Sequence, residues 1–213
     1  MRIILIYGRI MILRNFFKHC ANPQGFLGRV MLRCMNAGHE PQERKVRALI
    51  DWQNDWHVLD IGCGGGRNIA EILKLVSDGK VVGVDISDEA LSFSFSLNQE
   101  AVKAGNCEFF KASVHQLPFE LASFDCVCAF ETVYFWGDLK KAFSEVLRVI
   151  KPHGQFLIFV ECTETRIWDK VVPGMVAHSA EELRLQLLKV GFEYVDVRTI
   201  GNGACALTAY APS

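Results

Sequence analysis

A glycine-rich turn at residues 62–66 constrains the fold of this chain more than any other stretch. It follows a short apolar run from His57 to Ile61, has glycine at positions 62, 64, 65 and 66, and leads directly into an amphipathic segment. Glycine lets the backbone adopt positive φ and leaves no Cβ between the main chain and a ligand. A helix that starts there presents unpaired backbone N–H groups in its first turn. The stretch therefore predicts a strand, a turn that holds a cofactor, and a helix.

Two families of cofactor use such a turn, and the spacing of the glycines separates them. The dinucleotide fingerprint requires Gly-x-Gly-x-x-Gly, but Arg67 occupies the third glycine position when counted from Gly62. Here Asp60 stands two residues before the first glycine instead. Residues 58–66 closely resemble motif I of the class I methyltransferases that use S-adenosylmethionine (SAM). SAM carries an ammonium and a sulfonium group and no pyrophosphate, so an acidic turn suits it.

The next apolar run supports the same interpretation. Residues 81–84 (Val-Val-Gly-Val) end in Asp85, and Ser87 and Asp88 follow. A carboxylate at the tip of that strand can accept hydrogen bonds from both hydroxyl groups of a ribose. In the resembling family this acidic residue holds the adenosine ribose. The alternative is that Asp85 only shapes the turn before the next helix.

Further stretches are similar to the small-molecule methyltransferases related to the C-methylating enzymes of menaquinone and ubiquinone synthesis: residues 117–119, 124–127 and 145–152. The resemblance covers roughly residues 40–210 and is specific for SAM, not for the acceptor. One departure is Ser113, where the family usually has an aspartate that contacts adenine; the N–H of Val114 remains as a donor. The resemblance implies the following cofactor-binding residues: Asp60, Gly62, Cys63, Gly64, Gly66, Asp85, Ile86, Ser113, Val114 and Phe130.

Length and composition fit one globular α/β unit. The chain has 213 residues, 50% hydrophobic content and a formal net charge of −1. That charge offers no basic field for a polyanion, so we expect no nucleic-acid partner. The chain has no apolar run long enough to predict a transmembrane segment.

Strand and helix patterns alternate along the chain, which is typical of a parallel sheet covered by helices on both faces. We therefore expect an α/β fold: a doubly wound, mostly parallel, seven-stranded sheet of the Rossmann-like methyltransferase type, with N-terminal helices and a C-terminal antiparallel hairpin. Predicted strands are 107–111, 124–130 and 155–161, and the hairpin is 192–199 with 204–210. Predicted helices include 25–36, one marked by Val46, Leu49 and Ile50, and 67–76, 91–97, 139–150 and 179–190.

The eight cysteines predict neither disulfides nor a metal site. They form no Cys-x-x-Cys pair and show no paired Cys/His spacing. Cys126 and Cys128 alternate within an apolar strand and should face the same side of the sheet as small hydrophobes. Unbridged cysteines without a clear export signal favour a reducing, cytoplasmic location. Residues 1–13 are apolar but interrupted, and either Met1 or Met11 can be the start.

The strand at 124–130 should end at the edge of the sheet where ligands bind. Glu131 and Tyr134 follow it directly and are the candidates for contact with the acceptor or for proton removal. Glu131 has two alternatives, a contact to the cofactor ammonium or a structural pair. Tyr134, Phe135 and Trp136 either line an apolar acceptor pocket or simply cap the core.

We divide the chain into an N-terminal segment with a cap helix (1–40) and a SAM-binding domain (41–213). The cap is expected to cover the cofactor turn, although it can also only buttress the sheet. The function predicted is methyl transfer from SAM, with S-adenosylhomocysteine as product, to a small-molecule acceptor. A SAM-binding module without catalysis and a nicotinamide-dependent oxidoreductase are the alternatives. The acceptor, the atom methylated and the oligomeric state stay open.

Overall fold

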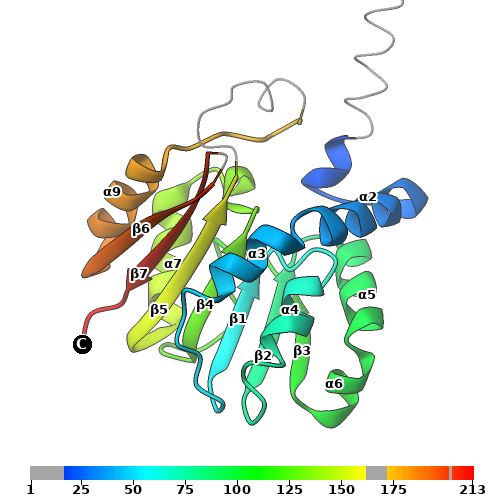
Figure 1. Cartoon of the computed structure of the whole chain (residues 1–213), viewed down its shortest axis with the longest axis horizontal. Helices are drawn as coiled ribbons and strands as arrows, with labels where there is room; N and C mark the ends of the chain where they lie inside the picture. Colours follow the sequence, from blue (N-terminus) through cyan, green and yellow to red (C-terminus); the bar gives the residue numbers. More distant parts are fainter. Residues whose placement is uncertain (1–16, 162–171, 202) are drawn as a thin grey trace, which may run out of the picture.

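The chain folds around a single seven-stranded sheet (Figure 1). The computed structural model describes residues 17–161, 172–201 and 203–213. The strands are β1 (His57–Ile61), β2 (Lys80–Asp85), β3 (Cys107–Lys111), β4 (Phe124–Phe130), β5 (Ile150–Val160), β6 (Tyr194–Gly201) and β7 (Ala204–Tyr210). The helices are η1 (Lys18–Cys20), α2 (Gly25–Gly38), α3 (Glu40–Arg47), α4 (Arg67–Ile72), α5 (Asp88–Leu97), α6 (Gln99–Ala104), η2 (Val133–Phe135), α7 (Leu139–Val149) and α9 (Ala180–Val190).

The strand order β3-β2-β1-β4-β5-β7-β6 confirms the predicted sheet. Strands β1 to β5 pair in parallel, whereas β7 pairs antiparallel with both β5 and β6. The order runs outward in both directions from the β1–β4 pair, which makes that pair the topological switch point. Ligands of open α/β sheets bind at the carboxyl ends of the strands beside such a point. At this edge of the sheet, β1 is followed by the glycine turn and β4 is followed by Glu131.

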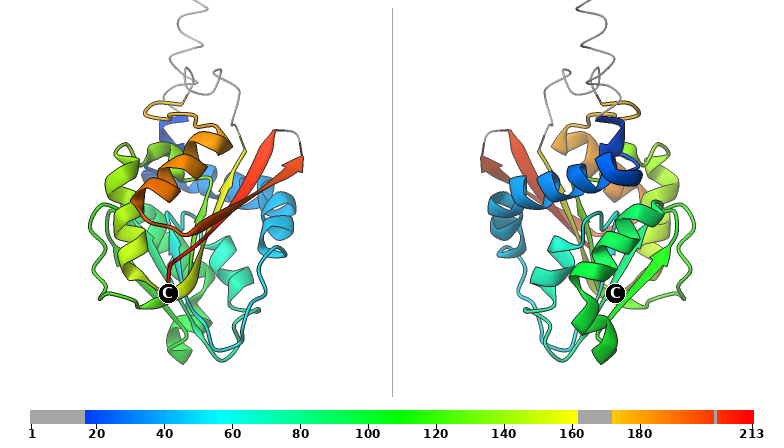
Figure 2. Two further views of the ribbon diagram at one scale, coloured as in Figure 1. Left: turned by 90° about the vertical axis from the view of Figure 1, so that its left-hand side faces the viewer. Right: turned by 90° about the vertical axis from the view of Figure 1, so that its right-hand side faces the viewer.

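Helices cover both faces of the sheet (Figure 2). One face packs against α7 and α9 through an apolar core that includes Phe143 and Leu187. The other packs against the helices that precede and follow the cofactor turn, through a core that includes Val46 and Ile69. Helix α2 lies across the end of the sheet where the arrowheads of the parallel strands point (Figure 1). The sheet is therefore doubly wound, as predicted.

Some element boundaries differ from the sequence prediction. The helix expected over 67–76 ends at Ile72, and Leu75 N–H then bonds to the Ile72 carbonyl three residues back. Leu49 and Ile50 lie beyond α3 in turns of the same kind, with bonds to Val46 and Arg47. Tight i→i+3 turns keep apolar side chains facing the core after a helix has ended. A helical spacing of apolar residues therefore overestimates helix length at these two ends.

The stretch 91–97 is helical as predicted, despite its period-two pattern. It lies in α5, whose N-cap Ser87 accepts a hydrogen bond from the Ala90 N–H. The parallel neighbours β2 and β3 need a crossover, and α5 with α6 supplies it. Tertiary topology thus overrides the local alternation.

Cys126 and Cys128 lie side by side in β4, with their Sγ atoms 3.9 Å apart, as the strand alternation predicts. In the described part of the chain, no cysteine is bridged to another. Within the same residues, no helix combines the length and the apolar character that a membrane span requires.

Candidate active site

The backbone of the glycine turn is fixed by positive φ angles. Gly62, Gly64 and Gly66 have φ of 74°, 49° and 72°. A Cβ at Gly62 would lie 2.2 Å from Thr132 Oγ1, so no larger residue fits there. A Cβ at Gly64 would meet no atom nearer than 3.8 Å. The main chain at Gly64 therefore faces open space, whereas Gly62 is packed.

Side chains from two neighbouring helices hold the carbonyl groups of the turn. Ser94 Oγ donates to the Gly64 carbonyl at 2.8 Å, and Asn98 Nδ2 donates to the Gly66 carbonyl at 3.0 Å. From α2, Asn36 Nδ2 donates to the Gly65 carbonyl at 3.0 Å. The turn is therefore tied to α5 on one side and to the N-terminal helix on the other.

Asp85 shapes the turn and also faces a cavity, so the ribose role stays a prediction. Its Oδ1 accepts from the Ser87 N–H at 2.9 Å, and its Oδ2 accepts from the Gly64 N–H at 3.0 Å. Each carboxylate oxygen has a second lone pair, and the residue lines a cavity. Burial raises the pKa of Asp85, while the backbone N–H groups of Ser87, Gly64 and Ile86 oppose that shift. Shaping the turn is thus compatible with contacting a ligand.

The first cavity opens over the glycine turn and measures about 140 Å³. Seven of the ten predicted cofactor-binding residues line it: Gly62, Gly64, Asp85, Ile86, Ser113, Val114 and Phe130. Ser113 is engaged locally, since its Oγ lies 3.1 Å from His115 Nδ1. Residues of the N-terminal segment close the cavity from above, Leu32 and Met35 among them.

Asp60, Cys63 and Gly66 do not line this cavity. Asp60 is 2% exposed, and burial raises the pKa of its carboxyl to about 7, with Asn68 and Arg47 opposing the shift. Cys63 packs in the core beneath the turn, and Gly66 caps α4. Their part in cofactor binding stays a prediction.

A second cavity of about 310 Å³ adjoins the first. Its wall is mainly apolar, with Phe17, Met31, Val172 and Met175 among its residues. The two cavities share the following wall residues: Cys20, Met35, Glu131 and Phe135. Because these side chains face both spaces, the cavities meet at Glu131.

Glu131 has an unusual backbone and a fixed side chain. Its φ of 56° lies in the left-handed region, which a non-glycine residue seldom adopts. Tyr134 Oη donates to its carboxylate, 3.2 Å from Oε1, and itself accepts from the Glu161 N–H at 2.6 Å. Backbone strain of this kind is often retained at functional sites. Tyr134 therefore positions Glu131 at the junction of the cavities.

Burial, together with the nearby Glu161 carboxylate, raises the pKa of Glu131 well above its ordinary value. Burial also raises the pKa of the Cys20 thiol to about 11. Cys20 is thus a neutral part of the wall, since the thiolate is the reactive form of cysteine.

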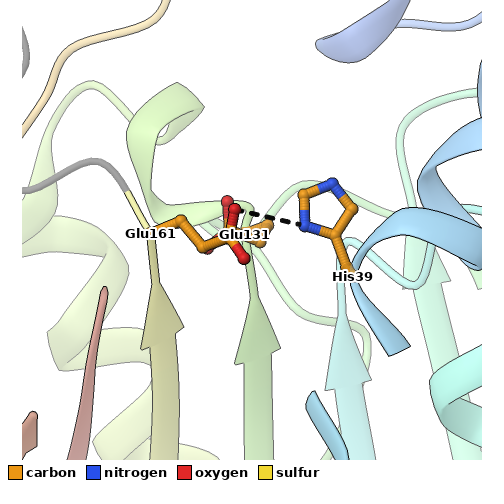
Figure 3. A group of neighbouring side chains, drawn as sticks. All are labelled: His39, Glu131 and Glu161. Carbon is orange, nitrogen blue, oxygen red and sulfur yellow. Dashed lines mark ion pairs between the residues drawn. The ribbon is translucent and has the colours of Figure 1, made fainter. Parts of the chain in front are cut away.

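The second cavity has a polar corner, drawn in Figure 3. His39 comes from the junction of α2 and α3, and Glu161 immediately follows β5. His39 Nδ1 lies 3.8 Å from Glu161 Oε2, and the carboxyl groups of Glu131 and Glu161 point toward the imidazole ring. The three residues come from distant parts of the sequence.

Comparison with known proteins identifies the fold and the cofactor. Residues 59–158 match the family model described as a methyltransferase domain. The chain is 28% identical over 184 residues to the O-methyltransferase resE of Aspergillus sclerotiorum, covering 80% of this chain and 69% of that protein. The matched residues form a SAM-dependent methyltransferase domain of class I. The matched region contains the glycine turn and the strand that ends at Glu131, so the resemblance noted from the sequence is confirmed.

One further curated relative and one solved structure are also similar to this methyltransferase. It is 32% identical over 130 residues to the cycloartenol-C-24-methyltransferase 1 of Oryza sativa subsp. japonica, covering 61% of this chain and 36% of the relative. A SAM-dependent methyltransferase from Aquifex aeolicus superposes with a TM-score of 0.73 at 21% identity, covering 85% and 97% of the two chains. The chain spans 36–69% of the length of the curated relatives named here. SAM is the cofactor of this family, and the residues that line the first cavity suit it: a glycine main chain without a Cβ and the Asp85 carboxylate face the same space.

Sequence reasoning missed two residues of the polar corner. Glu161 stands at the carboxyl end of a buried strand, the same signal that identified Glu131, and could have been found. His39 follows an amphipathic helix and has no local signal, because only the packing of α2 across the sheet brings it to the site.

Proposed function

We propose that this methyltransferase transfers the methyl group of SAM to a hydroxyl oxygen of a small, mainly apolar acceptor bound in the second cavity. The observation that carries this proposal is the shared wall: the cavity over the glycine turn and the apolar cavity meet at Glu131 and Phe135. Methyl transfer is an in-line displacement, which needs two bound reactants at adjoining sites. When bound, SAM supplies an electrophilic methyl group on its sulfonium.

The cofactor would be held by the turn and by the tip of β2. Gly64 gives a main chain that a ligand can approach closely, and Asp85 accepts from the ribose hydroxyls. Ser113 and Val114 are the residues we assign to adenine. Ser113 has no charge where the family usually has a carboxylate, so the adenine contact is the weaker part of the site.

The acceptor's shape and chemistry follow from the second cavity. A volume of about 310 Å³ falls at the lower end of ligand sites, which span roughly 300–1,000 Å³. Its apolar wall suits a hydrophobic body, and its polar corner suits one oxygen-bearing group. Carboxylate oxygens accept hydrogen bonds from a hydroxyl group, whereas a bare carbon nucleophile has nothing to donate. The relatives named as O-methyltransferases support the same choice.

Glu131 and Tyr134 have separate roles in this proposal. Glu131 would accept a hydrogen bond from the acceptor hydroxyl, direct the oxygen toward the first cavity, and take up the hydroxyl proton when the methyl group leaves the sulfonium for the oxygen. Tyr134 is a positioning residue, because its hydroxyl is bonded to Glu131 and to the backbone of Glu161.

The N-terminal segment is the cover that we proposed from the sequence. The first cavity, at about 140 Å³, is smaller than the roughly 300 Å³ of typical ligand sites. We infer that α2 moves outward to admit SAM and then closes over it. Closure would exclude water from the sulfonium and complete the wall of the second cavity.

We also propose a cytoplasmic location, on the basis of the unbridged cysteines in the described residues. Thiol labelling in intact cells with a membrane-impermeant and a permeant reagent tests it. Labelling of the exposed Cys34 by the impermeant reagent would contradict the proposal.

The function is tested with isotopically methyl-labelled SAM and a panel of small apolar molecules that carry a phenol or alcohol group. Each is paired with its analogue in which the hydroxyl is replaced by hydrogen. We expect label on oxygen only in hydroxylated members, as located by mass spectrometry. Transfer to the hydroxyl-free analogues, or to amines alone, would contradict the proposal.

A further inference from the structure

The polar corner of the second cavity has the composition of a cation site. The candidate ligand atoms of His39, Glu131 and Glu161 all lie within 4.8 Å of one another. One imidazole nitrogen and two carboxylates form a donor set that divalent transition-metal ions accept. The cysteine spacing predicted no metal site, and this corner contains no cysteine.

The distance between the imidazole and the Glu161 carboxylate is too long for a hydrogen bond and suits two ligands of one bridging ion. His39 Nδ1 and Glu161 Oε2 are 3.8 Å apart, beyond the range of a hydrogen bond. Nitrogen and oxygen ligands each lie about 2.0–2.2 Å from a zinc ion. Two such ligands of one ion are therefore separated by roughly 3–4 Å.

An orphaned polar atom points into the same space. His39 Nδ1 is buried and has no hydrogen-bond partner among the described residues. A buried polar atom without a hydrogen-bond partner raises the free energy of the folded state, and a bound ion would remove that cost. Figure 3 shows this nitrogen on the side of the ring that faces the two carboxyl groups.

The charge of the corner is also unbalanced. In the described part of the chain, His39 is the only basic side chain within ion-pair distance of Glu161, and no basic side chain lies within that distance of Glu131. The buried Arg47 is engaged elsewhere, at 2.8 Å from Glu40 and 3.6 Å from Glu43. The two carboxyl groups therefore have no fixed arginine or lysine beside them among the described residues.

We propose that His39, Glu131 and Glu161 bind a divalent transition-metal cation, of the Mn²⁺ or Zn²⁺ type, on the wall of the second cavity. All three residues line that cavity, so an ion held there can bind an oxygen atom of the acceptor. The binding of the ion rests on this cluster alone, whereas its contact with the acceptor rests on the proposed function.

The test uses the full chain, freed of metal with a chelator and then dialysed. Mn²⁺ binding is measured by the loss of the electron paramagnetic resonance signal of free Mn²⁺, and Zn²⁺ binding by calorimetry. We expect one ion per chain and an affinity at least tenfold lower in His39→Asn and Glu161→Gln. Circular dichroism establishes that each variant is folded.

His178→Asn is the matched control. His178 also pairs with a glutamate, at 3.2 Å from Glu182, but lies outside the three-residue cluster. It should bind Mn²⁺ as the unaltered protein does. Absence of Mn²⁺ and Zn²⁺ binding at millimolar concentration, or equal binding by the His39→Asn and His178→Asn variants, would overturn the proposal.

Methyl transfer by the chelator-treated protein separates this proposal from the proposed function. Failure to bind either ion overturns the cation site even if hydroxyl methylation proceeds. Ion binding that depends on His39 and Glu161 supports the site even if no hydroxylated acceptor is methylated.

Discussion

The two halves of the site are built in opposite ways. The cofactor half is a continuous turn, residues 62–66, whose conformation follows from glycine and is held by Ser94, Asn98 and Asn36. The proposed acceptor half is assembled from His39, Glu131 and Glu161, which come from three separate segments. A local motif thus identifies the cofactor, whereas the acceptor corner depends on tertiary packing. Variants in the two halves should therefore have different effects.

The largest effect is expected at Gly62. In Gly62→Ala the new Cβ would meet Thr132 Oγ1 at 2.2 Å, and φ of 74° would be strained. We expect a loss of about 3 kcal/mol in the free energy of unfolding, from overpacking and left-handed strain together. Urea denaturation measures it.

Gly64→Ala is the matched control for this prediction. Its Cβ would meet no atom nearer than 3.8 Å, but its φ of 49° is still left-handed. It should lose only about 1 kcal/mol of stability while weakening SAM binding more than tenfold by filling the cavity floor. Equal destabilisation by both variants would contradict the distinction between a packed and a ligand-facing glycine.

The buried Asp60 predicts a pH dependence of stability. Its pKa is raised to about 7 in the folded protein, against about 3.9 in an unfolded chain. The folded state favours the protonated form of Asp60. The contribution of Asp60 to the free energy of unfolding is therefore fully present below about pH 4 and is lost as the pH rises through about 7. Arg47 on α3 opposes the shift and Asp85 on β2 adds to it.

Asp60→Asn should remove this contribution. Between pH 5 and pH 7.5 the unaltered protein should lose on the order of 2–3 kcal/mol more unfolding free energy than the variant does. Denaturant titrations at both pH values measure the difference. An identical pH dependence in the two proteins would contradict the assignment.

At Asp85 we expect a large loss of SAM affinity. Asp85→Ala removes a carboxylate that we assign to the ribose, where hydrogen bonds to a charged group contribute about 1.5–3 kcal/mol each. SAM affinity, measured by calorimetry, should fall at least tenfold. Ser113→Ala should change it less than threefold, because the Ser113 hydroxyl is already engaged with His115. A larger effect at Ser113 than at Asp85 would reverse the assignment.

Tyr134→Phe tests the acceptor half without touching the turn. It removes the hydroxyl that links Glu131 to the Glu161 N–H. We expect about a tenfold lower kcat, equivalent to roughly 1.4 kcal/mol, with SAM affinity within twofold. The exposed Tyr194 gives the control Tyr194→Phe, which should not affect either quantity. Weaker SAM binding with unchanged kcat would show that Tyr134 belongs to the cofactor half.

The smallest effect is expected from the contact between the cap and the domain. Arg29 of α2 pairs with Glu89 of α5. Since exposed pairs contribute up to about 1 kcal/mol, Arg29→Ala should speed SAM association about two- to fivefold by easing the outward movement of α2. Stopped-flow fluorescence measures the rate. Arg184→Ala breaks a similar pair on α9 and should leave it unchanged. Slower association in Arg29→Ala would contradict the cap.

The same contrast explains what the sequence could predict. Local sequence signals predicted the sheet and the cofactor. They are the glycine turn, the strand alternation at Cys126 and Cys128, and the capping of α9 by Ser179. The ends of α3 and α4 were overestimated because tight turns preserve the helical spacing of apolar residues. The place of His39 in the polar corner could not be predicted, because α2 reaches the site only through tertiary packing.

The central claim is that cofactor and acceptor occupy adjoining cavities that meet at Glu131. A crystal structure of the full chain with S-adenosylhomocysteine tests it most directly. The account predicts the ribose on Asp85, the amino-acid part over Gly62 and Gly64, the sulfur facing Glu131, and the second cavity free of cofactor. A ribose bound away from Asp85, or a cofactor that fills the second cavity, would contradict it.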